Sequence, residues 1–126
     1  MASPVYELTV ERHFSAAHAL RCYEGACARV HGHNYRVEVS VAASALDDLG
    51  MLMDFTDLKR ICDEVVDTLD HTMLNDLEPF AVRNATSERI AEHVYRYVAG
   101  RLPESVRLQW VRVWETPSSA ATYREA

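Results

Sequence analysis

Three of the six histidines fall in a pattern that suits metal binding. His31 and His33 are separated by one glycine on an expected strand, so both side chains project from the same face and can chelate one ion. His18 ends the preceding expected strand, and an antiparallel neighbour would bring it alongside the pair. Three neutral imidazole ligands do not offset the charge of a zinc ion, and they leave its fourth coordination position open, as in a catalytic site. The alternative is that these histidines are surface or buried hydrogen-bonded residues, which is how we interpret His13 and His93.

Cys27 stands four residues before His31 and is a second group with chemical potential. A thiol near a metal or a cationic imidazole has a lowered pKa, which supplies thiolate as a base or nucleophile at neutral pH. The alternative is a small apolar filler. Cys62 fits that alternative because it lies on the apolar side of an expected helix, whereas Cys22 stays unassigned.

Charged groups also follow two of the expected elements. Asp70 and His71 come directly after a helix, and we expect these adjacent side chains to relay a proton through a third group more easily than to bond each other. The alternative is an interaction of charge with the helix end. Glu115 ends a strand, where its carboxylate can accept two parallel hydrogen bonds from a guanidine-like edge such as that of a 2-amino-pyrimidinone ring. The alternative for Glu115 is a solvated strand end.

The elements that must position these residues follow from the hydrophobic pattern. Alternation predicts strands at 5–11, 31–41 and 106–114, with a short fourth strand in the TYR stretch after the PSS turn. Apolar residues three and four apart predict one helix from Asp54 or Thr56 to Leu69 and a second from near Thr86 to Gly100. The order ββααββ predicts an α+β fold, with a four-stranded antiparallel sheet and two helices on one face.

Length and composition limit the classes of function. A chain of 126 residues has the size of one domain, so we expect a single unit over 1–126. The net charge of -6 argues against a nucleic-acid partner, and no apolar run is long enough for a membrane span. Three sparse cysteines fit a reducing compartment, and the first residues carry no export signal, so we expect a cytoplasmic protein.

Six short segments occur in one order across almost the whole chain: FSAAH (14–18), CARVHGHNY (27–35), MDFTDLK (53–59), LDHTMLND (69–76), NATSE (84–88) and WET (114–116). This series resembles the family of 6-pyruvoyltetrahydropterin synthase and 6-carboxytetrahydropterin synthase, lyases that have the tunnelling fold (T-fold). One departure is Ala85, where many relatives have proline.

The resemblance implies a role for each matching residue. His18, His31 and His33 would bind zinc, Cys27 would form a proton-transfer triad with Asp70 and His71, Glu115 would anchor the pterin ring, and Thr86 and Ser87 would add pterin contacts. The implied substrate is 7,8-dihydroneopterin triphosphate, a small molecule whose phosphates need local positive charge. Arg29 and Lys59 are the cations we expect there. The resemblance also implies a homohexamer built as a dimer of trimers, with sites at subunit interfaces.

The spacing favours one branch of the family. Three residues separate Cys27 from the HGH unit, which looks like the bacterial 6-carboxytetrahydropterin synthases of the queuosine (7-deazapurine) pathway. Their products would be 6-carboxytetrahydropterin, acetaldehyde and triphosphate. One alternative is a 6-pyruvoyl synthase, which eliminates triphosphate but keeps the carbon chain whole. Another is a non-catalytic zinc-binding or pterin-binding module, against which the joint presence of Cys27, Asp70 and His71 argues.

Overall fold

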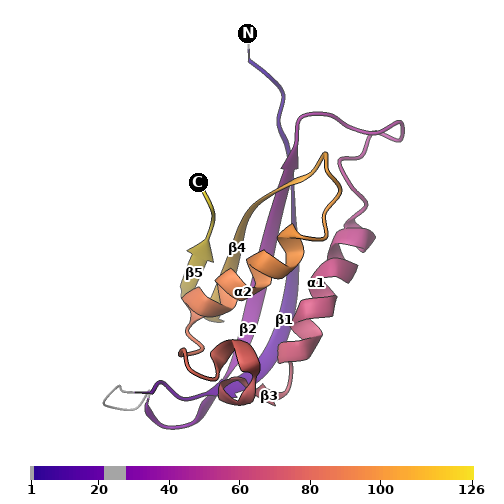
Figure 1. The fold of residues 1–126 in the computed structure, drawn as a ribbon. Coiled ribbons are helices and arrows are strands. Elements are labelled where there is room, and N and C mark those ends of the chain that lie inside the picture. The colour runs from indigo at the N-terminus through magenta and orange to yellow at the C-terminus, as the bar shows by residue number, and fades with distance from the viewer. Residues whose placement is uncertain (1, 22–27) are drawn as a thin grey trace.

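A computed structural model describes residues 2–21 and 28–126. The strands in these residues are β1 (Tyr6–His18), β2 (His31–Ala43), β3 (Thr72–Met73), β4 (Arg107–Thr116) and β5 (Ser119–Tyr123). The helices are α1 (Phe55–Leu69) and α2 (Ser87–Ala99), and two short 3-10 turns, Leu74–Asp76 and Glu78–Phe80, connect β3 to α2. Figure 1 shows the chain path.

The strands form one sheet in the order β3-β1-β2-β4-β5. The pairs β1/β2, β2/β4 and β4/β5 are antiparallel, as the sequence predicts. The expected count of four strands is wrong for the described residues, because β3 adds a fifth strand that runs parallel to β1. With only two residues, β3 is too short to show an alternating pattern.

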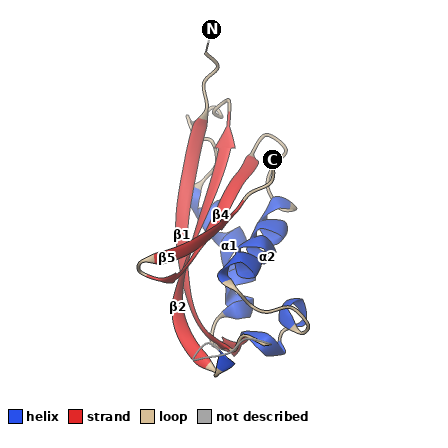
Figure 2. Ribbon diagram, turned by 90° about the vertical axis from the view of Figure 1, so that its left-hand side faces the viewer, coloured by secondary structure: helices blue, strands red, loops and turns tan. Residues whose placement is uncertain are grey.

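Both helices pack on one face of the sheet, which confirms the predicted α+β arrangement (Figure 2). Asp54 is the N-cap of α1, where its carboxylate accepts the N–H of Thr56 at 2.8 Å. Gly100 ends α2 as expected. None of the helices in the described ranges has the length and apolar character needed to cross a membrane.

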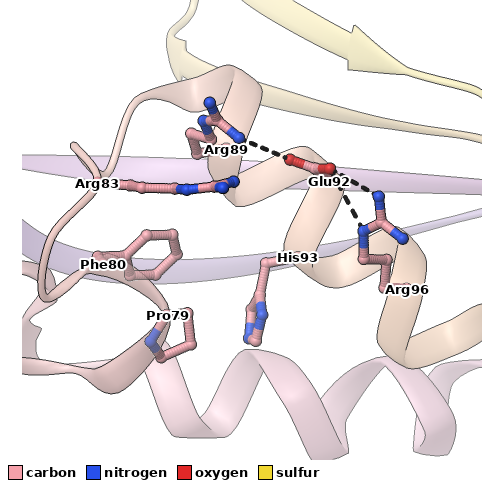
Figure 3. A pocket seen from close by; sticks show the side chains of 7 residues that line it. All are labelled: Pro79, Phe80, Arg83, Arg89, Glu92, His93 and Arg96. Carbon is pink, nitrogen blue, oxygen red and sulfur yellow. Dashed lines mark hydrogen bonds and ion pairs between the residues drawn. The ribbon is translucent and has the colours of Figure 1, made fainter.

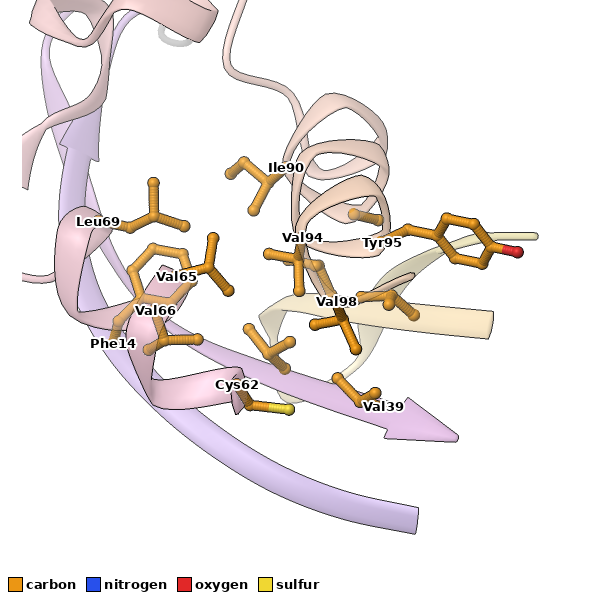
Figure 4. Packing of buried hydrophobic residues seen from close by; sticks show 14 of the residues in the cluster. Phe14, Val39, Cys62, Val65, Val66, Leu69, Ile90, Val94, Tyr95 and Val98 are labelled. Carbon is orange, nitrogen blue, oxygen red and sulfur yellow. The ribbon is translucent and has the colours of Figure 1, made fainter. Parts of the chain in front are cut away.

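The core fills the space between the sheet and the helices (Figure 4). Val39 contributes from β2, Leu69 from α1 and Val94 from α2, and each is almost fully buried. Burying one such side chain contributes about 1.5–3 kcal/mol. Cys62 is also fully buried in this cluster, which confirms the filler interpretation, and burial raises the pKa of its thiol to about 12.

β1 extends well beyond the predicted 5–11 segment, and this extension matters for the site. Arg12 lies on the helix-facing side of β1, where it pairs with Asp63 of α1 at 2.7 Å. A charged residue at a core-facing position interrupts the alternation that the sequence prediction relies on. The ladder nevertheless continues to its last pair, in which His18 lies opposite His31.

Candidate metal centre and active site

The β1/β2 register brings the three predicted histidines together. His18 lies opposite His31, and Ala16 lies opposite His33, so the imidazoles share the helix-facing side of the sheet. The ring centroids lie 4.5 Å apart for His18 and His31, 5.2 Å for His18 and His33, and 5.0 Å for His31 and His33. One nitrogen from each ring lies within 4.8 Å of the others, so the cluster is positioned to hold a metal ion.

Hydrogen bonds determine which nitrogen is available in two of these rings. Nδ1 of His18 lies 2.7 Å from the carbonyl of Ala85, and Nδ1 of His31 lies 2.7 Å from the carbonyl of Arg29. Because a carbonyl only accepts, each Nδ1 carries the proton and donates it. Nε2 of both rings is then left with the lone pair that binds a metal.

The residues fit a metal site on two further observations. Nε2 of His18 and Nε2 of His33 are buried, and neither has a hydrogen-bond partner in the part of the chain that the structure describes. Buried polar atoms without partners are rare in proteins, and a bound metal ion would satisfy both of these nitrogens. Burial lowers the pKa of His33, with further lowering by the neighbouring imidazoles, against an opposing effect of Glu115. The ring is therefore neutral at neutral pH, the form that coordinates a metal.

Glu115 of β4 lies next to this cluster. Its Oε1 is 3.4 Å from Nε2 of His33, and its Oε2 accepts a hydrogen bond from the hydroxyl of Ser87 at 3.2 Å. A hollow of about 210 Å³ opens beside the carboxylate, lined by Ser87, Glu88, Glu115 and residues 119–121. The carboxylate therefore faces both the histidine cluster and a space that a small ring can enter.

Three residues of the NATSE segment make different contacts. Thr86 caps α2, because its hydroxyl accepts the N–H of Arg89 at 3.2 Å, whereas Ser87 reaches Glu115. Ala85 is fully buried and holds His18 through its backbone carbonyl. Because proline has the same carbonyl, the departure from proline at this position leaves the contact with His18 available.

Asp70 and His71 do bond each other, so the expectation that adjacent side chains cannot easily do so is wrong. Nδ1 of His71 lies 2.9 Å from Oδ2 of Asp70. The reason is the backbone at His71, whose φ of 57° is left-handed and turns the ring back toward the carboxylate. Ser15 stabilises this turn at both ends, donating its N–H to Asp70 at 2.9 Å and accepting the N–H of His71 at 2.6 Å.

This pair is separated from the histidine cluster within one chain. The side chain of His71 is 82% exposed beside β3, the edge strand. Its anchor Ser15 precedes His18 by three residues, about 10 Å along a strand. Among the described residues, no hydrogen bond or ion pair joins Asp70 or His71 to the cluster. Cys27, the expected third member of the proton-transfer triad, and Cys22 lie outside the described residues.

Only one of the two cations expected near the substrate phosphates lies next to the histidine cluster within one chain. Arg29 adjoins the cluster, since its carbonyl holds His31. Lys59 lies on the first half of α1, ten residues before Leu69, which is about 15 Å along the helix axis. The structure therefore does not bring Lys59 to the cluster within one chain.

A second hollow, of about 290 Å³, lies on the outer side of α2 (Figure 3). It carries three arginines, of which Arg89 and Arg96 pair with Glu92 at 3.3 and 2.9 Å. These are ordinary pairs between side chains three and four residues apart on a helix surface. The residues of this hollow include none of the predicted site residues.

The sequence motifs and the geometry agree with the comparison to known proteins. A sequence profile described as 6-pyruvoyl tetrahydropterin synthase matches residues 7–126. The chain belongs to this family. It is 41% identical over 130 residues to 6-carboxy-5,6,7,8-tetrahydropterin synthase of Bacillus subtilis (strain 168), covering 94% of the chain and 85% of the relative. It is also 41% identical over 117 residues to the enzyme of that name from Synechocystis sp., covering 87% and 86%.

A solved structure confirms the predicted T-fold. The 6-pyruvoyl tetrahydropterin synthase of Caenorhabditis elegans superposes with a TM-score of 0.86 at 30% identity, covering 100% of this chain and 99% of that one. The 6-pyruvoyl tetrahydropterin synthase family is a family of enzymes that act on pterins. The sequence prediction of a pterin synthase is therefore confirmed at the level of the family.

Two further residues, which the sequence patterns do not single out, support the site. Asn75 and Asn84 bind the backbone of Ala19 and Arg21, immediately after His18. Both asparagines lie in motifs that carry the family resemblance, LDHTMLND and NATSE. An isolated asparagine in a connecting segment, however, has no periodic pattern that would indicate its partner.

Proposed function

We propose that this protein is a zinc-dependent 6-carboxytetrahydropterin synthase. It would convert 7,8-dihydroneopterin triphosphate to 6-carboxy-5,6,7,8-tetrahydropterin, acetaldehyde and triphosphate. The observation that carries the proposal is the pair of buried Nε2 atoms of His18 and His33, which have no hydrogen-bond partner among the described residues and lie beside Glu115. The 41% identity to the Bacillus subtilis enzyme of this name supports the choice of product.

His18, His31 and His33 would hold the zinc ion through Nε2. When bound, zinc supplies a Lewis acid that polarises the oxygens of the substrate side chain and acidifies the neighbouring C–H. The backbone carbonyls of Ala85 and Arg29 keep two of the three rings in the required tautomer.

Glu115 would bind the pterin ring. An ionised carboxylate accepts two parallel hydrogen bonds from the guanidine-like edge of a pterin. The hydroxyl of Ser87 donates to Oε2 and so orients the carboxylate toward the hollow beside it. Thr86 would add a pterin contact through atoms that its capping bond leaves available.

Cys27, Asp70 and His71 would transfer protons between the substrate side chain and the ring. The hydrogen bonds from Ser15 and His71 lower the pKa of Asp70, so this carboxylate is ionised at neutral pH and can orient the imidazole of His71. Because His71 is exposed at the sheet edge, its access to the cluster would come from a neighbouring subunit of a homohexamer.

A 6-pyruvoyl tetrahydropterin synthase is the second candidate, and the superposition on the Caenorhabditis elegans enzyme of that name favours it. That reaction would eliminate triphosphate and leave the carbon chain whole. Three residues between Cys27 and the HGH unit favour the carboxy branch. The third candidate, a non-catalytic zinc-binding or pterin-binding module, would show no turnover.

One incubation separates these candidates. Zinc-loaded protein is mixed with 7,8-dihydroneopterin triphosphate, the pterin product is identified by mass, and acetaldehyde is assayed. We expect 6-carboxytetrahydropterin and an equal amount of acetaldehyde. A pyruvoyl product without acetaldehyde would establish the second candidate, and unchanged substrate would establish the third. Glu115→Gln is the matched variant, which we expect to keep its zinc and lose most turnover.

The cellular setting is part of the same proposal. A cytoplasmic location agrees with the three sparse cysteines, and the product would enter the biosynthesis of queuosine or another 7-deazapurine. Isotope tracing from the labelled product into deazapurine bases tests this assignment.

A further inference from the structure

The segment that follows His18 is bound by two side-chain amides in the same manner. Oδ1 of Asn75 accepts the N–H of Ala19 at 3.0 Å, and its Nδ2 donates to the carbonyl of Ala19 at 2.9 Å. Asn84 makes the corresponding bonds with Arg21, at 2.8 and 3.2 Å. Each amide thus satisfies both backbone groups of one residue, as a neighbouring strand would.

These bonds extend the edge of β1 beyond its last pairing with β3, which is between Ala17 and Met73. The guanidinium of Arg21 adds three bonds in the opposite direction, to the carbonyls of Phe80 at 2.8 Å, Asn75 at 3.1 Å and Arg83 at 3.4 Å. Residues 19–21 and 75–84 are therefore tied together from both sides.

The same bonds determine where the partner of His18 lies. Asn84 directly precedes Ala85, whose carbonyl accepts the proton of Nδ1 of His18 at 2.7 Å. This acceptor belongs to the backbone, so its position depends on the bonds that hold its neighbours. On one side Asn84 binds Arg21, three residues after His18, and on the other side Thr86 caps α2.

We propose that Asn75 and Asn84 are positioning residues of the histidine site. By binding Ala19 and Arg21 they hold the carbonyl of Ala85 against Nδ1 of His18, and so keep Nε2 of that ring directed at the cluster. The inference rests on the proposed function only in taking His18 as a zinc ligand.

The tautomer of His18 in the metal-free protein tests this directly. Long-range 1H–15N correlation spectra of labelled protein distinguish the two neutral forms of each imidazole. We expect His18 of the wild type to carry its proton on Nδ1. In Asn84→Ala the carbonyl is no longer held, so the ring should exchange between both tautomers. Asn75→Ala should show the same change, and it decides the question if Asn84→Ala does not fold.

Zinc affinity, measured by competition with a chelator, is the second readout. Partners that orient a ligand typically contribute about 10-fold to 100-fold in metal affinity, so we expect both asparagine variants to bind zinc about 10-fold more weakly. Gln109→Ala is the matched control. Its amide also makes two hydrogen bonds, at 2.7 and 3.1 Å, but to Ser40 and Glu7, on the opposite face of the sheet. We expect the control to keep wild-type affinity.

A folded asparagine variant that retains both the Nδ1–H tautomer and wild-type zinc affinity would overturn the inference. Failure of the proposed function looks different. In that case the wild type does not convert the pterin triphosphate, while the His18 tautomer still changes in the asparagine variants.

Discussion

At the scale of single residues, the histidine cluster depends on the backbone more than on other side chains. His18 and His31 each donate a proton to a main-chain carbonyl, so the ring orientations are properties of the fold. Asp70 differs, because a neighbouring side chain and a backbone N–H both bind its carboxylate. The proposed ligands and the proposed proton-transfer groups are thus held by different means, and substitutions should separate them.

Cys27→Ala should separate metal binding from proton transfer. If Cys27 is a base, three imidazoles already complete the protein's share of the metal site, so zinc content and fold should not change. Turnover should fall by a factor of about 100 or more, the scale of a lost general base. Metal analysis and steady-state kinetics on one preparation check both parts.

Cys62→Ala is the control, since Cys62 is fully buried in the core. Loss of a buried thiol should lower the free energy of unfolding by about 1 kcal/mol and leave turnover intact. Loss of zinc in Cys27→Ala would make that thiol a ligand, and an active Cys27→Ala enzyme would remove it from the mechanism.

The Asp70 carboxylate should make stability depend on pH. Its pKa is lowered, first by the N–H of Ser15 and then by His71. Because the folded pKa lies below the unfolded one, the stabilisation is complete above the unfolded pKa, about 3.9, and is lost as the pH falls through the folded pKa. The Tm difference between wild type and Asp70→Asn should therefore be present at about pH 5 and shrink as the pH falls through the folded pKa of Asp70.

Thermal denaturation across this range is the measurement. Asp76→Asn is the control, because Asp76 is exposed and makes no side-chain hydrogen bond with the described residues. A Tm difference for Asp70→Asn that persists unchanged to the lowest pH would show that the Ser15 bond does not depend on the charge of Asp70.

At the scale of elements, the start of α2 places the helix cap, Thr86, next to Ser87, which bonds the proposed pterin ligand Glu115. Thr86→Ala removes the cap and should lower the free energy of unfolding by about 1 kcal/mol, whereas Thr86→Ser should restore it. Ser87→Ala leaves the cap in place but frees Glu115, so we expect KM to rise with little change in Tm. An unchanged KM in Thr86→Ala would show that Thr86 acts as the cap alone and would contradict its proposed pterin contact.

Most of these elements could be predicted from the sequence, because the core imposes a period on each. Tyr35, Val37 and Val39 belong to the predicted alternating face of β2 and are fully buried. The apolar side of α1 also packs into the core, as predicted. The three-histidine cluster could be predicted for the same reason, since two of its members lie on that alternating face.

The contacts that could not be predicted from the sequence are made by residues outside any periodic hydrophobic pattern. A left-handed backbone at a non-glycine residue such as His71 leaves no trace in composition, so the bond to Asp70 could not be foreseen. The partners of Asn75 and Asn84 lie more than 50 positions away in the chain, and only the fold brings them together. The separation of His71 from the histidine cluster likewise depends on how β3 joins the sheet.

At the scale of the whole molecule, one face of the sheet lacks a helical cover in the described part of the chain (Figure 2). This face carries Trp114 beneath Arg36 and Trp110 beneath Arg112, at 4.5 and 4.4 Å. β5 also leaves an edge at one side of the sheet, and such edges are commonly covered by further copies. We expect light scattering to report a mass several times 14.3 kDa. A stable, active monomer at micromolar concentration would contradict the expected hexamer.

The central claim is that the three histidines form the metal centre of a pterin synthase, and zinc removal tests it most directly. Protein stripped with a chelator should lose conversion of 7,8-dihydroneopterin triphosphate and regain it on addition of about one zinc ion per chain. His31→Ala should not regain it, whereas His13→Ala should, because His13 is exposed and lies outside the cluster. Full turnover by the metal-free protein, or full zinc retention by His31→Ala, would contradict the account.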